Sequence, residues 1–411
     1  MNLVVLTSSY PRFEGDGAGA FVARWCESLV ARGHRVRVLC FRGPEARGGV
    51  RRGVDLRFVP YAPRPWERLF FGQGGPENLE REPGLAALAV PAVAAMFGAA
   101  LAEVRRERCD RVVGHWVLPG GLVARAVERV TGVPSAIVGH SGGVHALGGL
   151  PAAVSARLAR AALAGPLTMS SAPLAATLAR LAGAPGRGGA TPVAPMGYDG
   201  PAPEGAPGVD AWRGDGALRV GFMGRLVPIK GVDRAIRAVQ ELRSAGLDVT
   251  LEIAGEGAER RRLERPGGEE GVCFRGHLSG AEKASFLHRL DVFVMPSRRM
   301  ASGRHEGMPV SLLEAAGVGA VPVVGEVPGV ERWLAEPDWQ VAQRADELRG
   351  ALRRVAELKA RSPEGYLALR AQTRARVESL CWPAYAARWE RWLESPQRGF
   401  WDAPGAVAVE G

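Results

Sequence analysis

Short apolar runs alternate with amphipathic helical patterns along most of this 411-residue chain, and this alternation limits the possible fold more than any other feature. The run LVVLTSS (3–9) is typical of a strand, residues 18–32 carry apolar side chains at helical spacing, and RVRVLCF (35–41) is typical of the next strand. Two later strand-like runs, RVVGHWV and SAIVGHS, each lead into a glycine-containing loop. Strand–helix–strand repeats favour parallel strands covered by helices, so the sequence predicts a doubly wound α/β fold.

A second series of the same kind begins at residue 218, with the strand-like runs LRVGFMG, VTLEIAG, VCFRG, VFVMPS and AVPVVG. Between the two series, the Gly- and Pro-rich stretch GYDGPAPEGAPGVDAWRGDG lacks apolar periodicity, which is typical of a linker. The chain also exceeds the usual size of one hydrophobic core. We therefore expect four segments: an N-terminal domain over 1–196, a linker over 197–216, a C-terminal domain over 217–380, and a helix with a tail over 381–411 that packs back toward the first domain.

The net charge of +10 comes almost entirely from Arg, because only Lys230, Lys283 and Lys359 among the 53 basic residues are Lys. A basic surface suits an anionic membrane face, a phosphorylated substrate or nucleic acid. No basic run exceeds three residues, so the excess is equally consistent with no specific partner. The five cysteines are widely spread and never in C-x-x-C spacing, which indicates neither a disulfide framework nor a zinc site.

The start of the chain lacks a basic leader and a small-residue cleavage site, so we expect a cytoplasmic protein. The least charged long stretch is GLAALAVPAVAAMFGAALA (84–102). Ala and Gly dominate it and Pro91 interrupts it, which favours a buried or interfacial helix over a transmembrane one.

A turn with two cations, GRLVPIKG (224–231), follows the first strand of the second series and precedes a helix. Helix amides and the helix dipole favour anions at such a position, and the side chains of Arg225 and Lys230 add to this. Lys230 is notable in a chain that otherwise uses Arg, since Lys supplies a compact point charge. The alternative is that both are solvated loop cations.

The stretch HEGMPVSLLEAAG (305–317) places two carboxylates eight positions apart in an apolar run. Pro309 fits the first turn of a helix, so the preceding residues would form a turn with free amides. Glu314 would be partly buried in that helix, where a carboxylate is a good acceptor for paired hydroxyls. The alternative is a solvated Glu306 and a Glu314 that pairs with a structural Arg.

Together these motifs resemble the retaining nucleotide-sugar glycosyltransferases of family 4 (glycosyl transferases group 1), which have the GT-B fold of two Rossmann-like domains facing each other across a cleft. The run EGMPVSLLE resembles the E-x7-E signature of that family, and GRLVPIKG resembles its G-R-L-x-x-x-K-G loop. PMGYD (195–199) is similar to the P-x-G-x-D motif of the family. Three N-terminal segments also resemble segments that are common in the family: SSYPRFEGDGAGAFV, RGHRVRVL and GHWVLPGGL.

The resemblance implies roles for these residues. Arg225 and Lys230 would hold the donor diphosphate and stabilise the charge of the departing nucleotide. Glu306 would accept hydrogen bonds from hydroxyl groups of the sugar, and Glu314 would accept them from both hydroxyl groups of the ribose. The other donor-binding residues that the resemblance implies are Gly307 and Met308 through their amides, Pro309 and Val310 at the helix start, Arg275 and Gly276 near the base, and Gly17 and Gly19 in a loop close to the phosphates.

In the first domain, the resemblance makes His140 a catalytic candidate beside Arg225, Lys230 and Glu306. It ends SAIVGHS, where the family often has H-G-x-D, and would hydrogen-bond the donor sugar. Here Gly143 stands where that pattern often has Asp. Acceptor-side candidates are His115, Trp116 and His145, although core packing explains the first two equally well.

These features lead us to expect a retaining, metal-independent hexosyltransferase with no cofactor. It would use a UDP- or GDP-sugar and a glycan, glycolipid or small-molecule acceptor, in cell-wall or exopolysaccharide biosynthesis. We expect no nucleic-acid partner. Residues 61–79 would form an acceptor-side loop, and the protein would be cytoplasmic or peripheral at the inner face of the membrane. The alternatives are a sugar-nucleotide epimerase, a phosphorylase, or a catalytically silent binding protein.

Overall fold

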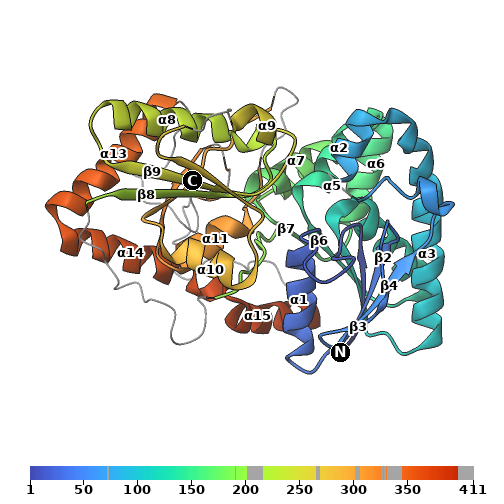
Figure 1. Ribbon diagram of the computed structural model, residues 1–411. Helices are drawn as coiled ribbons and strands as arrows, with labels where there is room; N and C mark the ends of the chain where they lie inside the picture. Colours follow the sequence, from blue (N-terminus) through green and yellow to red (C-terminus); the bar gives the residue numbers. More distant parts are fainter. Residues whose placement is uncertain are drawn as a thin grey trace. The chain divides into compact units, whose positions relative to one another are not determined.

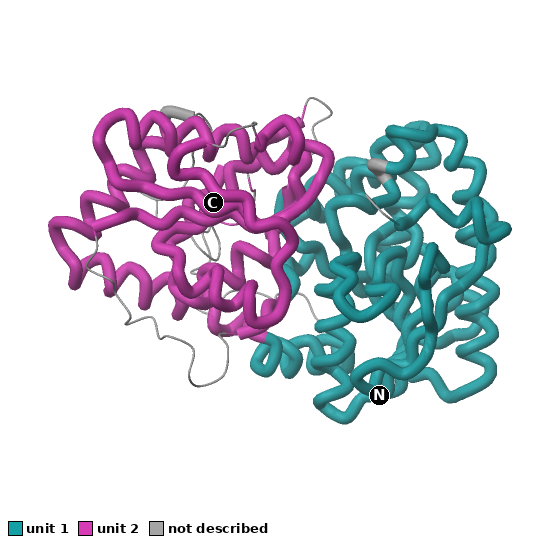
Figure 2. Tube along the Cα trace, viewed as in Figure 1, with its two compact units in different colours: residues 1–196, 382–411 teal, residues 197–381 magenta. Residues whose placement is uncertain are grey.

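A computed structural model describes residues 1–71, 74–189, 191–200, 216–264, 269–300, 306–325, 327, 330 and 345–396. The chain divides into two compact units (Figure 2). Unit 1 comprises residues 1–196 and 382–411, and unit 2 comprises residues 197–381. Most of the expected linker, residues 201–215, lies outside the described residues.

Unit 1 is built on a seven-stranded sheet of order β3-β4-β2-β1-β5-β6-β7, in which only β3 runs antiparallel to its neighbour (Figure 1). Apolar side chains on both faces make the central strands buried, as a parallel sheet between helices requires. The loops after β1 and β5 diverge at the reversal of strand order, where doubly wound sheets bind ligands. The strands are β1 (Asn2–Thr7), β2 (Arg35–Phe41), β3 (Gly49–Arg51), β4 (Val54–Val59), β5 (Arg111–His115), β6 (Ser135–Gly139) and β7 (Leu167–Met169).

Helices cover the faces of this sheet. They are α1 (Ala20–Val30), α2 (Gly75–Arg81), α3 (Ala89–Arg106), α4 (Leu122–Thr131), α5 (Ser141–Gly148), α6 (Ala152–Leu163) and α7 (Ala172–Leu181), with the short turns η1 (Arg64–Trp66), η2 (Pro83–Leu88), η3 (Trp116–Gly121) and η4 (Pro185–Arg187). An amphipathic pattern explains most of them; in α1, for example, the face carrying Val22, Trp25 and Leu29 is fully buried.

Helix α15 (Trp382–Glu394) returns to unit 1 and packs against α1. The rings of Trp25 and Trp389 meet edge to face with centroids 5.6 Å apart, a favourable aromatic geometry. Glu390 accepts a hydrogen bond from Arg32 Nε at 2.6 Å, and Tyr385 Oη donates to the carbonyl oxygen of Pro195 at 2.6 Å. A distant part of the chain thus completes the unit.

Unit 2 has a five-stranded, all-parallel sheet of order β10-β9-β8-β11-β12. Its strands are β8 (Leu218–Met223), β9 (Val249–Ala254), β10 (Val272–Gly276), β11 (Val292–Met295) and β12 (Val321–Val324). Its helices are α8 (Val232–Ser244), α9 (Arg260–Leu263), α10 (Gly280–His288), α11 (Val310–Gly317), α13 (Ala345–Arg361) and α14 (Pro363–Val377), with turns η5 (Pro228–Lys230) and η6 (Glu378–Leu380). Two doubly wound parallel-sheet units confirm the predicted fold class, and in unit 2 the strand order reverses between β8 and β11.

A buried polar cluster holds the opposite end of the unit 2 sheet. The carboxylate of Asp291, just before β11, accepts hydrogen bonds from Lys359 Nζ at 2.8 Å, Tyr366 Oη at 2.6 Å and the amide of Arg219 at 2.8 Å. Asp291, Lys359 and Tyr366 are all buried. Because every donor comes from a different element, the cluster ties α13 and α14 to the start of β8 and β11.

Helix α3 has a buried face and an exposed face. Ala92, Met96 and Ala100 are fully buried against the sheet, whereas Val90 is 77% exposed. Among the described residues, one helical stretch, Pro83–Arg106, has the length and apolar composition of a membrane span, which is weak evidence by itself.

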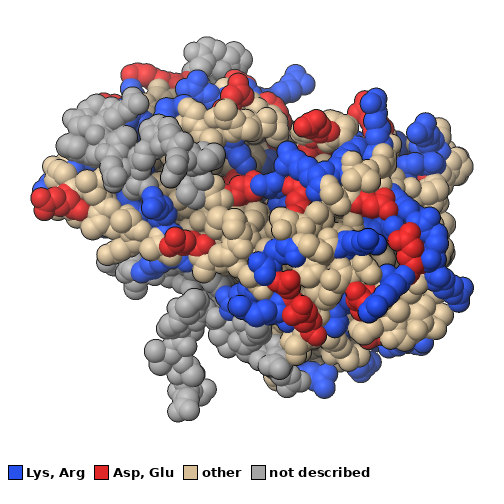
Figure 3. Space-filling model, turned by 90° about the horizontal axis from the view of Figure 1, so that it is seen from below, with Lys and Arg blue, Asp and Glu red and all other residues tan. Residues whose placement is uncertain are grey.

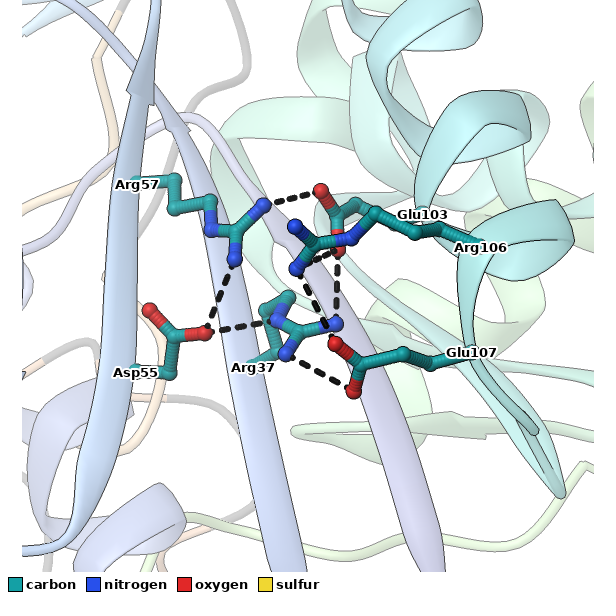
Figure 4. A network of polar contacts seen from close by, with 6 residues as sticks. All are labelled: Arg37, Asp55, Arg57, Glu103, Arg106 and Glu107. Atoms are coloured by element: carbon teal, nitrogen blue, oxygen red, sulfur yellow. Dashed lines mark hydrogen bonds and ion pairs between the residues drawn. The ribbon is translucent and has the colours of Figure 1, made fainter.

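Near the C-terminal end of α3, charged side chains join the helix to β2 and β4 in one network of ion pairs (Figure 4), formed by Arg37, Asp55, Arg57, Glu103, Arg106 and Glu107.

Candidate functional site

The loop between β8 and α8 presents Lys230 at the carboxyl edge of the unit 2 sheet. Gly231 takes the left-handed conformation, with φ of 63°, and a Cβ there would collide with the carbonyl oxygen of Pro296. The amide of Arg298 donates to the carbonyl oxygen of Ile229 at 2.9 Å. The loops after β8 and β11 are therefore fixed against each other by backbone contact.

An ion pair spans these two loops. Lys230 Nζ lies 3.2 Å from Glu306 Oε2, and its other recorded contact is the sulfur of Met295 at 3.9 Å. Lys230 is 8% exposed, and the Glu306 side chain is 22% exposed. The nearly buried ammonium of Lys230 needs a hydrogen-bond acceptor. The carboxylate of Glu306 supplies one and is itself still partly exposed to water. The pair joins the two motifs that the sequence analysis singled out.

The turn after Glu306 leads directly into α11. Gly307 and Met308 are half-buried, Pro309 is the N-cap in an extended conformation, and the helix begins at Val310. Pro309 thus stands one position before the first helical residue, where its missing N–H costs nothing. Within the described residues, the amides of Gly307 and Met308 have no recorded backbone acceptor. These two backbone N–H groups are suited to a ligand that has several hydrogen-bond acceptors.

Glu314 lies in the second turn of α11, and its side chain is 11% exposed. Its Oε1 accepts a hydrogen bond from Lys283 Nζ, in α10, at 2.8 Å. The sequence analysis named an Arg as the alternative partner of Glu314, and the structure adds Lys283 as a partner. Lys283 was missed, although the scarcity of Lys was a usable signal, because all three lysines of the chain make buried or partly buried ion pairs.

Two further predicted donor-side residues are exposed at the surface of unit 2. Arg225 is exposed on the loop just after β8. Arg275, also exposed, is the last residue but one of β10 and donates from Nε to Glu252 Oε2 at 2.7 Å. Gly276 follows with φ of 70°. No recorded contact in the described residues joins Arg275 to the Lys230–Glu306 pair, so a shared role in binding stays a prediction.

In unit 1, the loop after β1 is held in shape by Asp16. Its carboxylate accepts from Arg12 Nε at 2.7 Å, from the Arg12 amide at 3.0 Å and from the Ala18 amide at 3.2 Å. Burial alone would raise the pKa of Asp16, but these hydrogen bonds outweigh it and hold that pKa below its ordinary value. Gly17 is exposed in this loop, which therefore presents backbone to solvent from a preformed turn.

Gly19 is required by the loop itself. It is the N-cap of α1, with φ of 65°, and a Cβ there would collide with the carbonyl oxygen of Ser9. The chain therefore needs glycine here whether or not a ligand approaches.

His140 lies in an aromatic cluster at the carboxyl ends of β5 and β6. Its Nε2 is 3.2 Å from Nδ1 of His115, and the two rings are stacked with centroids 5.4 Å apart. Trp116 and Phe21 approach the His140 ring at 5.0 and 5.2 Å. The sequence placed Phe21 only within the predicted helix over 18–32, because a contact between that helix and the end of a distant strand is not visible in a linear pattern.

Both imidazoles of this cluster are neutral at pH 7. Burial lowers the pKa of His140 to about 3. Burial, with the neighbouring His140, lowers the pKa of His115 well below its ordinary value. His140 can therefore orient a ligand by hydrogen bonding, but it does not act as a cation or as a titrating acid at neutral pH. His115 is fully buried, so the structure favours its packing role.

Gly143 and His145 lie on α5, which follows His140. A Cβ at Gly143 would stand 2.8 Å from the amide nitrogen of Val117, so helix α5 packs on η3 more closely than a side chain allows. His145 is half-buried one turn from the start of the helix. Gly143, where the family pattern often has Asp, thus allows the close packing of α5 on η3, the two segments that follow β6 and β5.

Comparison with known proteins agrees with this architecture. The model "Glycosyl transferases group 1" matches residues 217–357, and "Glycosyl transferase 4-like domain" matches residues 16–187. Crystal structures of HepE from Anabaena with UDP and of WaaG share the fold, with TM-scores of 0.64 and 0.57 and identities of 15% and 17%. These alignments cover 96% and 93% of this chain and 100% and 98% of the neighbours.

Sequence relatives match more locally. A 2-deoxystreptamine glucosyltransferase of Streptomyces kanamyceticus is 34% identical over 146 residues, which is 34% of this chain and 37% of the relative. A GDP-mannose-dependent alpha-mannosyltransferase of Mycolicibacterium smegmatis is 36% identical over 127 residues, which is 31% of this chain and 30% of the relative. The matches thus span about a third of each curated relative.

Two doubly wound units with this loop pattern define the GT-B class. Within it, the chain belongs to the family-4 type of glycosyltransferases, as the sequence predicted.

Proposed function

We propose that this protein transfers a hexose from a nucleotide diphosphate sugar to a hydroxyl group of an acceptor. The Lys230–Glu306 pair carries this proposal, because it places a cation and a hydroxyl acceptor side by side where β8 and β11 diverge. In family 4, Lys230 would face the diphosphate and Glu306 the sugar. The names of relatives and neighbours, which mention GDP-mannose, UDP and UDP-glucose, support a UDP- or GDP-sugar donor.

In the proposed reaction, the bond between the anomeric carbon and the diphosphate oxygen breaks while an acceptor oxygen bonds to the same face of that carbon. The leaving diphosphate takes the acceptor proton, so the anomeric configuration is retained without a protein nucleophile. Lys230 and Arg225 would offset the charge of the leaving group in the place of a metal ion. Unchanged turnover in EDTA and a retained anomeric coupling constant in the product would support this mechanism, and an inverted product would overturn it.

Donor binding gives the direct test of the function. A ligand at 100 times its Kd stabilises the native state by about 2.7 kcal/mol, so UDP or GDP, each beside its sugar conjugates, should raise the melting temperature. Glu314→Gln should reduce this shift, since a neutral amide is a weaker acceptor for ribose hydroxyls. Glu357→Gln, on the exposed side of α13, is the matched control and should leave it unchanged.

The alternative functions predict different results when the same protein is assayed with the same donors. An epimerase would convert or hydrolyse the donor without an acceptor, and a silent binding protein would bind nucleotide without turnover. If no nucleotide raises the melting temperature of the wild-type protein, the donor assignment is wrong.

We further propose that the protein works at an anionic membrane surface on the cytoplasmic side, in polysaccharide or glycolipid biosynthesis. Trp66, at 63% exposure, and Val90 are large apolar side chains of unit 1 that are exposed to solvent, and Arg64 lies two positions before Trp66 in the same turn η1. Trp and Arg are suited to the interface of an anionic bilayer. On the face seen in Figure 3, basic and acidic side chains are interspersed and form no purely basic patch.

Val90→Asp tests this surface. The substitution removes a side chain that would enter the bilayer and adds a charge that anionic lipids repel, so partition onto phosphatidylglycerol vesicles should fall about tenfold. Val50→Asp is the matched control, because Val50 is 75% exposed on β3 and should bind like the wild type. Equal binding by Val90→Asp and wild type in cosedimentation would remove α3 from the membrane contact.

A further inference from the structure

A cavity lies in unit 1, apart from the residues discussed so far as donor ligands. It has a volume of about 240 Å³, and its walls combine three cations with apolar side chains. It opens beside the segments that follow β1, β2 and β4, at the carboxyl edge where a parallel sheet presents ligand sites. The side chains that matter to its chemistry are Arg12, Arg68, Arg81, Glu82, Phe71 and Leu85.

The walls of this cavity are fixed without any ligand. Asn78 Nδ2 lies 3.0, 3.1 and 2.6 Å from the carbonyl oxygens of Arg68, Leu69 and Phe71, which ties the segment after η1 to α2. Tyr61 Oη accepts from the amide of Leu69 at 3.1 Å. A binding site whose backbone is already ordered loses less entropy on binding, so the cavity is preorganised.

Two of the cations are also held in place. The guanidinium of Arg12 lies over the rings of Phe13 and Phe71, 5.3 and 5.5 Å from their centroids, while its Nε donates to Asp16. Arg68 forms a bidentate ion pair with Glu82, with N–O distances of 2.8 and 3.3 Å. Arg12 and Arg68 therefore present fixed donors, each with part of its charge already balanced.

Arg81 supplies the unbalanced charge. It is exposed at the C-terminal end of α2, and no ion pair or hydrogen bond of its side chain is recorded within the described part of the chain. With Arg12, Arg68 and Arg81 against Asp16 and Glu82, the cavity carries a net positive charge. The buried side chains of Phe71 and Leu85 add apolar surface to the lining of the same cavity.

We propose that this cavity binds an anionic group, such as a phosphate, that is attached to an apolar chain, and that it is a subsite for the acceptor. Guanidinium groups bind phosphate through paired N–H donors, and the apolar surface would cover the adjoining carbons. The volume is below that of a site for a whole drug-sized ligand, so it holds one part of a larger acceptor. The acceptor role rests on the proposed hexosyltransfer, whereas the binding itself does not.

Calorimetry of the full chain with soluble probes tests the binding. Hexyl phosphate should bind more tightly than inorganic phosphate or a neutral hexyl glucoside, because each of these lacks one half of the recognised group. Arg81→Gln should weaken hexyl phosphate on the order of tenfold, as expected for loss of one charge-assisted contact. Glu82→Gln should strengthen it, since the change removes a like charge and releases Arg68.

Arg108→Gln is the matched control, because Arg108 is an exposed cation of unit 1 that pairs with Asp110 outside the cavity. All three variants alter exposed side chains and should keep the wild-type melting temperature. Binding that is equal in Arg81→Gln and wild type, or weakened equally by Arg108→Gln, would overturn the proposal.

The role of the site is tested separately. In an assay with a phosphorylated acceptor, Arg81→Gln should raise the KM for that acceptor and leave slow donor hydrolysis unchanged. If the wild type neither transfers nor hydrolyses any donor while hexyl phosphate binding still depends on Arg81, the proposed function fails and the site stands. Vesicles containing phosphatidic acid identify the source: weaker cosedimentation of Arg81→Gln assigns the phosphate to a lipid, and unchanged cosedimentation assigns it to a soluble acceptor.

Discussion

Lys230→Met should lower kcat/KM for sugar transfer by about 10²–10³, the usual cost of removing one group that stabilises developing negative charge. Met preserves most of the length and apolar stem of Lys beside Met295, so packing should be retained. The partner carboxylate of Glu306 is partly exposed and stays hydrated when it loses the ammonium. The melting temperature should therefore change by only a few degrees, in contrast to the activity.

Two variants separate a functional pair from a structural one. Arg262→Met removes an exposed cation of α9 in the same unit and should keep full activity. The double variant Lys230→Met with Glu306→Gln removes both charges, so any strain from an unpaired partner disappears. It should remain as inactive as the single variant, and recovery of wild-type turnover would show that the pair only supports the fold.

Asp291→Ala should have the largest effect on stability, about 3–5 kcal/mol, because it leaves a buried ammonium without its counter-charge. Lys359 is 5% exposed, so water can replace the lost carboxylate only in part. The hydroxyl of Tyr366 would lose its acceptor in the same step. Amide hydrogen exchange in β8 and β11 should therefore accelerate, since these strands begin at the cluster.

The compensating variant Asp291→Asn with Lys359→Met should recover more than half of this loss, because neither side of the ion pair remains charged. A loss of stability in the double variant equal to that of Asp291→Ala would mean that shape rather than charge determines the effect. Glu357→Gln, two residues from Lys359 on the exposed side of α13, controls for changes to the helix itself.

Much of the fold could be predicted because parallel strands buried on both faces leave continuous apolar runs. The runs at 3–9, 35–41 and 292–297 correspond to β1, β2 and β11 within a few residues. Strands β3 and β4 were missed because their sequence, GVRRGVDLRFV, carries many charges. The structure shows where two of these charges go, since Asp55 and Arg57 join the ion network on α3 (Figure 4).

The site was predictable only where its signal is local. A cationic turn and a Glu pair can be read from spacing, so Lys230 and Glu306 were named as candidates, and the structure brings them into contact. The partner of Glu314 could not be deduced in the same way, because Lys283 lies 31 positions earlier on another helix. The stacking of His115 on His140 likewise depends on two adjacent strands whose ends coincide in space. Such contacts follow from strand order, which no short motif records.

The return of α15 to unit 1 makes unit 2 an insertion in the folding sequence of the chain. A ribosome produces all of residues 197–381 before it produces the helix that covers Trp25. During that interval α1 lacks its final neighbour, and the emerging first unit exposes an indole that is fully buried in the finished protein. Synthesis therefore imposes an order: unit 2 can close on its own sheet, whereas unit 1 is completed last.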